Sequence, residues 1–201
     1  MFDLFGIIIK GGPVMAPLLV CSIIALAAVI DRFFYWRRIS SRTEVEEILS
    51  LVERGEIAKA CSLGDQTDTP LGRVLVSGLA HRNPSISKAL EVAAQKEVPI
   101  LKQRLTILDT IITLAPLLGL LGTVTGMIGS FGIMSQSGIG QPHAVTGGVA
   151  EALIATATGL LIAILTLVPY NYFTSRVERE MEEIEYYSSR LELLLGEIEK
   201  K

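Results

Sequence analysis

The segment EALIATATGLLIAILTLVPYNYF, residues 151–173, decides the fold of this chain. As a helix it is long enough to cross the hydrocarbon core of a bilayer, which takes about 20 residues. Between Asp109 and Arg176 the chain contains one Asp, Glu, Lys or Arg, and this residue is Glu151. A lone carboxyl beside a membrane-length segment is costly to keep, so Glu151 is a candidate functional residue.

Hydrophobic residues make up 50% of the 201-residue chain and are gathered into blocks. The mean hydropathy is +0.48. Three blocks, at about 13–36, 106–134 and 148–173, are long enough to cross a membrane as helices. No stretch has the ten-residue alternation of a barrel strand. The pattern predicts an all-α membrane protein with three transmembrane helices.

The first block lies near the N-terminus, where a cleaved signal peptide is the alternative. The apolar run is longer than a typical signal-peptide core, and no small-residue cleavage site follows it. It continues into aromatic and then basic side chains: Phe33, Phe34, Tyr35, Trp36, Arg37 and Arg38. An aromatic belt followed by a basic stop is typical of a retained membrane helix.

Lys and Arg are distributed unevenly around the three blocks. One precedes the first block, twelve lie from Arg32 to Arg104, five follow from Arg176, and the loop between the second and third blocks has none. The positive-inside rule therefore predicts an outer N-terminus and an inner C-terminus. The expected segments outside the membrane are a periplasmic N-terminal segment (1–12), a cytoplasmic helical region (37–105), a periplasmic loop (135–147) and a cytoplasmic helical tail (174–201).

Helical periodicity continues outside the membrane. We predict a helix pair or a bend around Gly55, a short helix at about 71–81 and a break at Asn83-Pro84. No comparable break follows from Ser85 to about Met134, so the second membrane helix is expected to extend into the cytoplasm as one rod of about 75 Å. In the tail, apolar residues follow heptad-like steps and predict helical neighbours: Val177, Met181, Ile184, Ser188, Leu191, Leu195 and Ile198.

Small residues recur every three or four positions in the second and third membrane helices. The predicted packing residues are Gly119, Gly122 and Gly126 in the second helix, and Ala152, Ala155 and Gly159 in the third. Such faces let helix backbones approach closely in lipid. Threonines such as Thr123 and Thr156 accompany them. Most membrane threonines bond back to their own helix, but two such helices in several copies would line a narrow, weakly polar lumen.

Glu151 is expected near the outer end of the third helix. The alternative to a functional acid is an interfacial glutamate favoured by the dipole at the helix N-terminus. On an ideal helix Glu151 is about 140° from Thr156 and about 20° from Thr158, at 100° per residue. Both Glu151 and Thr156 would face one lumen only on a distorted helix.

Other function classes lack support in the sequence. The net charge of −3 does not indicate the basic surface that a nucleic-acid-binding protein needs. We find no metal-ligand spacing, no nucleophile motif and no phosphate loop, so no catalytic residue, metal or cofactor is predicted. Asp109, one turn beyond Lys102 and Arg104, is expected to be an ion-paired residue at the cytoplasmic side.

The stretches APLLGLLGTVTGMIGSF (115–131) and GGVAEALIATATGLLIAILTLVPYNYF (147–173) resemble the MotA/TolQ/ExbB proton channel family, and within it ExbB most closely. The resemblance implies an inner-membrane motor component. It further implies a homopentamer whose central pore holds the single transmembrane helices of an ExbD-like dimer. Proton flow would then drive work on a TonB-like protein for outer-membrane transport.

By motif, the resemblance makes Thr123 and Thr156 pore-facing hydroxyls and Glu151 the family's intramembrane glutamate, while the proton-carrying aspartate belongs to the ExbD-like partner. Three alternatives stay open: a TolQ-like subunit for outer-membrane maintenance, a non-conducting membrane scaffold and a self-sufficient small-solute transporter. The last is disfavoured because three helices lack the inverted repeats of that class.

Overall fold

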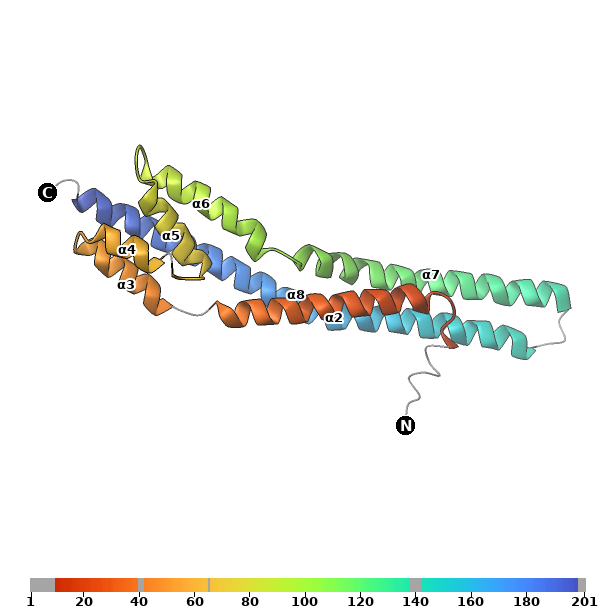
Figure 1. Ribbon diagram of the computed structural model, residues 1–201. Helices are drawn as coiled ribbons and strands as arrows, with labels where there is room; N and C mark the ends of the chain where they lie inside the picture. Colours follow the sequence, from red (N-terminus) through yellow and green to blue (C-terminus); the bar gives the residue numbers. More distant parts are fainter. Residues whose placement is uncertain (1–9, 40–41, 65, 138–141, 199–201) are drawn as a thin grey trace. The chain divides into compact units, whose positions relative to one another are not determined.

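The computed structural model describes residues 10–39, 42–64, 66–137 and 142–198. Within them the chain forms seven α-helices and no strand (Figure 1), which confirms the predicted all-α class. The helices are α2 (Met15–Arg38), α3 (Arg42–Glu53), α4 (Ile57–Gly64), α5 (Pro70–Ala80), α6 (Ile86–Leu101), α7 (Leu105–Ser137) and α8 (Pro142–Ile198). Residues 1–9 of the predicted N-terminal segment and 138–141 of the predicted loop lie outside the described residues.

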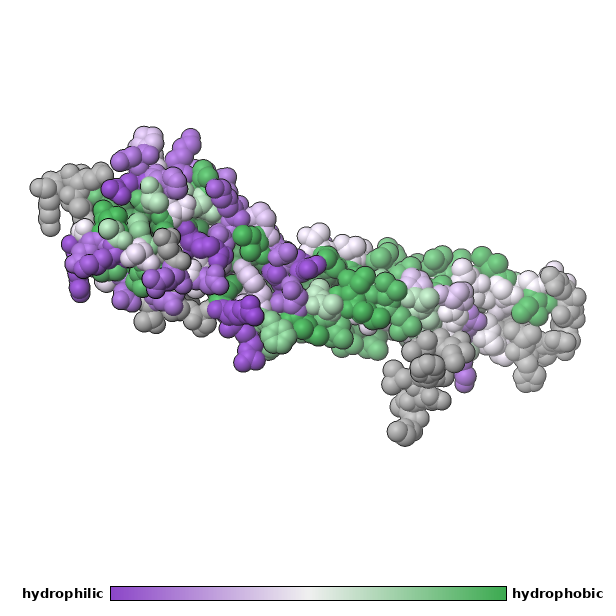
Figure 2. Space-filling view, in the orientation of Figure 1, coloured by the Kyte–Doolittle hydropathy of each residue, from purple (hydrophilic) through white to green (hydrophobic). Residues whose placement is uncertain are grey.

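Three of these helices, α2, α7 and α8, are long and apolar enough to cross a membrane. Their outward faces carry large aliphatic side chains; Ile164, Leu165 and Val168 on α8 are each at least 60% exposed. Figure 2 shows hydrophobic surface over much of α2 and along α7. A continuous apolar surface of this kind is unfavourable in water and favourable in lipid.

The chain divides into two compact units. The first comprises residues 1–31 and 104–172, and so contains most of α2, all of α7 and the first part of α8. Its described core is formed by small and medium apolar residues, including Leu18, Ala25, Leu108 and Ala115. Small core residues suit helices that pack at close range in lipid.

The second unit comprises residues 32–103 and 173–201, and contains α3 to α6 and the tail of α8. Its core is aliphatic and includes Ile48, Leu49, Leu75 and Leu79, all fully buried. The heptad-like positions Val177, Ile184, Leu191 and Leu195 of α8 are also buried. The predicted helical neighbours of the tail are therefore present; the side chain of Ile198 lies outside the described residues.

The helix boundaries predicted from the sequence are confirmed in this second unit. Gly55 separates α3 from α4 with φ of +76°, a conformation that favours glycine. Thr69 caps the N-terminus of α5, where its hydroxyl accepts a hydrogen bond from the Gly72 N–H at 3.1 Å. The helix ends at Ala80, just before the Asn83-Pro84 break.

The prediction of one unbroken helix from Ser85 to Met134 is wrong. Helix α6 ends at Leu101 and α7 begins at Leu105. Arg104, between them, has φ of +68°, which no α-helical residue adopts. Pro99 lies in the last turn of α6 and supplies no backbone N–H, so the helix is weakened just before the break.

The expected ion pairing near Asp109 also differs. Arg104 Nε lies 3.7 Å from Asp31 Oδ2. Asp31 is the last residue of α2 that belongs to the first unit. Asp109 itself forms no ion pair among the described residues.

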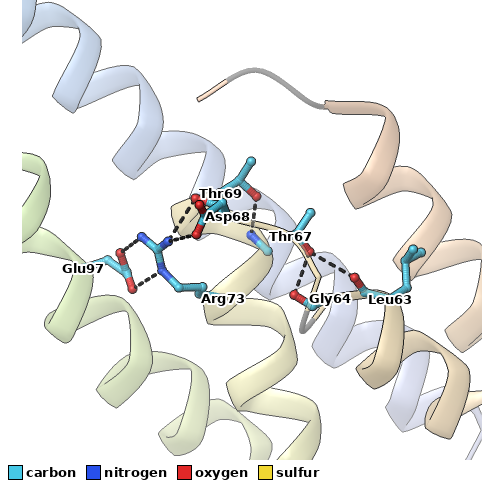
Figure 3. Close-up of polar contacts among 8 residues, drawn as sticks. Leu63, Gly64, Thr67, Asp68, Thr69, Arg73 and Glu97 are labelled. Carbon is cyan, nitrogen blue, oxygen red and sulfur yellow. Dashed lines mark hydrogen bonds and ion pairs between the residues drawn. The ribbon is translucent and has the colours of Figure 1, made fainter. Parts of the chain in front are cut away.

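A bidentate ion pair joins α5 to α6 (Figure 3). Arg73 Nε and Nη2 donate to the two carboxylate oxygens of Glu97 at 2.9 and 2.7 Å, and Arg73 Nη1 donates to the Asp68 carbonyl at 2.9 Å. The hydrogen bond to buried Glu97 raises the pKa of the Arg73 guanidinium, although burial opposes that shift. This planar, charge-assisted contact fixes α5 against α6.

Candidate functional site on the packed α7 and α8 helices

The predicted packing glycines of α7 lie against α8. A Cβ added at Gly119 would lie 3.0 Å from Thr156 Cα and 3.1 Å from the Ala155 carbonyl oxygen. A Cβ at Gly126 would lie 2.9 Å from the Gly148 carbonyl oxygen and 3.0 Å from Ala152 Cβ. Any side chain here would meet backbone on the opposite helix, so the small residues permit the close approach.

The same contact continues at the other packing residues. A Cβ at Gly122 would lie 2.5 Å from Ala155 Cβ, and one at Gly159 would overlap the Ala115 carbonyl oxygen. Ala152 and Ala155 are buried. The structure thus brings all six predicted packing residues to one α7–α8 contact within a single chain.

Thr156 belongs to this contact as well. Its hydroxyl donates to the Gly119 carbonyl at 2.8 Å, across from α8 to α7. Most other described membrane hydroxyls bond within their own helix; Thr158, for example, donates to Ile154 and Thr166 to Ile162. Thr156 therefore crosslinks the two helices through a hydrogen bond that replaces the usual bond back to its own backbone.

Thr123 is half-buried on α7, and its hydroxyl donates to the Leu120 carbonyl at 2.6 Å. Thr125, two residues on, is exposed and bonds to the carbonyls of Leu121 and Gly122. A threonine that donates to its own helix still presents its oxygen lone pairs outward. Both residues thus place an acceptor at the surface of α7 within this chain.

Glu151 lies on a different side of α8. Its carboxylate occupies the space where a side chain at Gly12 would be, immediately before α2. Gly12 has φ of +72°. On the next turn of α8, Ile154 lies 3.1 Å from the Cβ position of Gly11. Glu151 therefore contacts the start of α2, whereas Thr156 contacts α7, in keeping with the wide angle expected between them on an ideal helix.

Two features of this site were not predicted from the sequence. One is the contact of Glu151 with Gly12, for which the Gly11-Gly12 pair before an apolar run was the available signal. The other is the contact of Ser130 with Gly148: Ser130 was expected on the small-residue face of the second membrane helix, and its buried hydroxyl occupies the Cβ position of Gly148. Both depend on packing between residues that are far apart in the chain.

The described residues contain no group of three or more His, Cys, Asp or Glu side chains that could hold a metal ion. The arrangement instead provides close helix contact, hydroxyl groups and one carboxyl. These features define a helical membrane protein with sparse polar groups on apolar, tightly packed helices.

Comparison with known proteins identifies the family. Residues 66–186 match the MotA/TolQ/ExbB proton channel family. The chain is also 37% identical over 191 residues to a Synechocystis protein named ExbB-like 3, across 92% of this chain and 91% of the relative. This chain belongs to the MotA/TolQ/ExbB proton channel family.

More distant relatives fall in the same group. An ExbB homolog of Methanothermobacter thermautotrophicus is 29% identical over 196 residues, which cover 92% of this chain and 69% of the relative. The Tol-Pal system protein TolQ of Haemophilus influenzae is 38% identical over 90 residues, which cover 45% of this chain and 40% of TolQ. The chain is thus a membrane protein of a proton channel family, and that family is not one of enzymes.

Proposed function

We propose that this chain is an ExbB-like motor subunit of a bacterial inner membrane. With an ExbD-like partner it converts the proton motive force into mechanical work on a TonB-like protein, which drives active transport across the outer membrane. The observation that carries the proposal is the α7–α8 pair, where Thr156 and the packing glycines meet and where Glu151 is the one acid from residue 110 to residue 175.

The proposal includes a homo-oligomer, with a pentamer as the expected form. Thr123 and Thr156 then lie along a central pore, and Glu151 lies near its outer end. A proton path across the membrane needs a titratable group near mid-depth, and Glu151 is close to one end of its apolar segment. A second polypeptide, expected to be an ExbD-like dimer inside the pore, supplies the missing acid.

The orientation in this proposal follows the distribution of basic residues. Of the twelve Lys and Arg residues from Arg32 to Arg104, all except Arg104 belong to the second unit. The Lys and Arg residues from Arg176 onward belong to it as well. By the positive-inside rule this unit is cytoplasmic and the N-terminus is periplasmic. Its helices α3 to α6 and the α8 tail are then the cytoplasmic extensions of the motor.

A substitution at Thr123 tests the pore assignment. Thr123→Leu should abolish energised uptake of an iron-chelate while the oligomer stays intact, because a bulky apolar side chain removes the hydroxyl and narrows the lumen. Thr125→Leu is the matched control, since Thr125 is two residues away on α7 and also bonds to its own helix. Normal uptake by the Thr123→Leu variant would show that Thr123 does not line the pore.

Glu151 is tested separately by Glu151→Gln and Glu151→Ala. If the carboxyl takes part in proton transfer, both variants lose proton-coupled activity, because neither side chain titrates. Helix α8 begins at Pro142, so Glu151 is not in its first turn. If Glu151 only packs against Gly12, both variants retain activity. Proton uptake into vesicles that contain the chain and its partner is the measurement.

A TolQ-like subunit that energises outer-membrane maintenance is the second candidate, favoured by the similarity to TolQ. Complementation separates the two: a TolQ-like chain restores detergent resistance to a strain without TolQ, whereas an ExbB-like chain restores iron-chelate uptake to a strain without ExbB. A non-conducting scaffold would support neither activity in a protonophore-sensitive way.

A further inference from the structure

The second unit contains a basic hollow at the end of α5 and along one side of α6. Its volume is about 390 Å³, and its charged or titratable lining residues are His81, Lys88 and Lys96, with no acid among them. Pro84, Ala89 and Val92 form its apolar part. Val92, between the two lysines, is 47% exposed. The hollow therefore suits an acidic surface.

The tail of α8 presents an acidic surface. Glu185, Ser189 and Glu192 are exposed there, and they lie within about 60° of one another around the helix, at 100° per residue. The match with the hollow is therefore one of charge. Among the described residues, Lys88, Lys96, Glu185 and Glu192 have no ion-pair partner.

The spacing of the charges also matches. Lys88 and Lys96 are eight residues apart on α6, or about 12 Å along the axis, and Glu185 and Glu192 are seven apart on α8, or about 10.5 Å. Helix α6 and the α8 tail run in opposite directions in Figure 1. An antiparallel approach therefore places Lys88 opposite Glu192 and Lys96 opposite Glu185.

The two surfaces lie at the same level of the second unit. The acidic face itself lines a groove of about 310 Å³ beside α6 of the same chain, with Glu185, Ser189 and Glu192 of α8 and Ser87, Glu91 and Val98 of α6 in its wall. These stretches of α6 and α8 therefore flank one another within a chain. Copies in one ring are related by rotation about a common axis, so every copy offers the same pair of surfaces to its two neighbours.

We propose that the acidic face of the α8 tail in one copy docks into the basic α5–α6 hollow of the next copy. The contact joins two different surfaces, so it is heterologous, and repeated around an axis it closes a ring. The complementary charges set the register and exclude a symmetric pairing of two basic hollows. The inference rests on the proposed homo-oligomer and names the cytoplasmic contact through which neighbouring copies bind.

Zero-length carbodiimide crosslinking of the full chain in its native membrane tests the contact, because it joins a lysine amine to a carboxylate only when the two are in direct contact. We expect dimers and larger multimers whose linked peptides join Lys88 to Glu192 or Lys96 to Glu185. The double variant Glu185→Gln/Glu192→Gln should reduce the multimer yield several-fold. The double variant Glu44→Gln/Glu47→Gln removes the same charge from α3, whose residues line neither the hollow nor the groove, and should leave the yield unchanged.

A charge exchange distinguishes loss of the contact from loss of the folded structure. Lys88→Glu/Lys96→Glu alone should weaken the crosslinked ring, and combination with Glu185→Lys/Glu192→Lys in the same chain should restore it. Multimers linked only at other sites, or equal yields in both glutamine variants, would overturn the inference while leaving the proposed motor function intact. Multimers with these links but without proton-coupled activity would instead reject the motor function and keep the contact.

Discussion

The backbone of Gly12 leaves the space that the carboxylate of Glu151 fills. A methyl group added at Gly12 would overlap Oε1 of Glu151 and lie 2.6 Å from its Cδ. The positive φ of Gly12, +72°, turns this open side toward α8. The candidate proton-transfer acid is therefore positioned by the residue that precedes α2, far away in the sequence.

Gly12→Ala should displace the Glu151 carboxyl without unfolding the chain, because the overlapping atoms are the end of a flexible side chain. We expect lower proton-coupled activity and a changed rate of carbodiimide labelling at Glu151, measured by mass spectrometry. Gly55→Ala is the control, since Gly55 has φ of +76° with nothing within 4 Å of its Cβ position. Both variants place an alanine at a positive φ, which costs about 1–2 kcal/mol of backbone strain. A difference in activity between the two variants therefore measures the effect of the contact between Gly12 and Glu151.

Shortening the acid gives an independent check of the same relationship. Glu151→Asp withdraws the carboxyl from Gly12 by one methylene group and should partly restore the activity of Gly12→Ala. Equal labelling rates at Glu151 in the wild type and in Gly12→Ala would contradict the positioning role.

Thr156→Val should loosen the α7–α8 contact, because valine retains the shape but cannot donate to the Gly119 carbonyl. We expect a loss of about 0.6–1 kcal/mol in the free energy of unfolding in detergent. Thr156→Ser retains the donor and should lose less. Thr158→Val, which removes a bond within α8 only, is the control; an equal loss there would deny any special role to the bond between the helices.

Gly159→Ala and Gly129→Ala should change stability in opposite directions. A Cβ at Gly159 overlaps the Ala115 carbonyl oxygen, so the helices must separate, at a cost of about 1–3 kcal/mol. A Cβ at Gly129 has nothing within 4 Å, so alanine there gains about 0.5–1 kcal/mol from helix propensity. Thermal unfolding of the isolated chain in detergent measures both; stabilisation by Gly159→Ala would contradict the packing described for α7 and α8.

Glu97→Gln should destabilise the second unit by about 1–3 kcal/mol, because it removes the charge that satisfies the Arg73 guanidinium. Asp68→Asn is the matched control. The Asp68 carboxylate is fully exposed and 3.8 Å from Arg73, so its loss should change stability little. The measurement is hydrogen exchange of the α5 and α6 amides. Similar protection in Glu97→Gln and Asp68→Asn would contradict a stabilising role of the Arg73–Glu97 ion pair.

Glu56 provides a prediction about pH. The hydrogen bond from Lys59, at 2.8 Å, and the positive charge of Lys59 lower the pKa of Glu56 from 4.5. Because the folded pKa is the lower one, the stabilisation is present above the unfolded value and is lost as the pH falls through the folded value. An NMR titration should show the lowered pKa, and Lys59→Gln should return it toward 4.5; an unchanged titration in that variant would exclude Lys59 as the cause.

The order of residues alone determined much of this protein. Segment length and hydrophobicity indicated three membrane helices, and the recurrence of small residues indicated the faces on which α7 and α8 meet. The heptad-like tail and the stops at Gly55 and Asn83-Pro84 were equally local. Such features can be read from the sequence because helix length, periodicity and turn chemistry depend on neighbouring residues.

The tertiary structure decided the features that join distant residues. The left-handed turn at Arg104 interrupts what the apolar pattern presented as one helix. Thr156 bonds to Gly119 instead of to its own helix, and Glu151 lies against Gly12 instead of beside Thr156. These outcomes depend on how close two backbones come after packing, and that separation is set by all the contacts of the folded chain together.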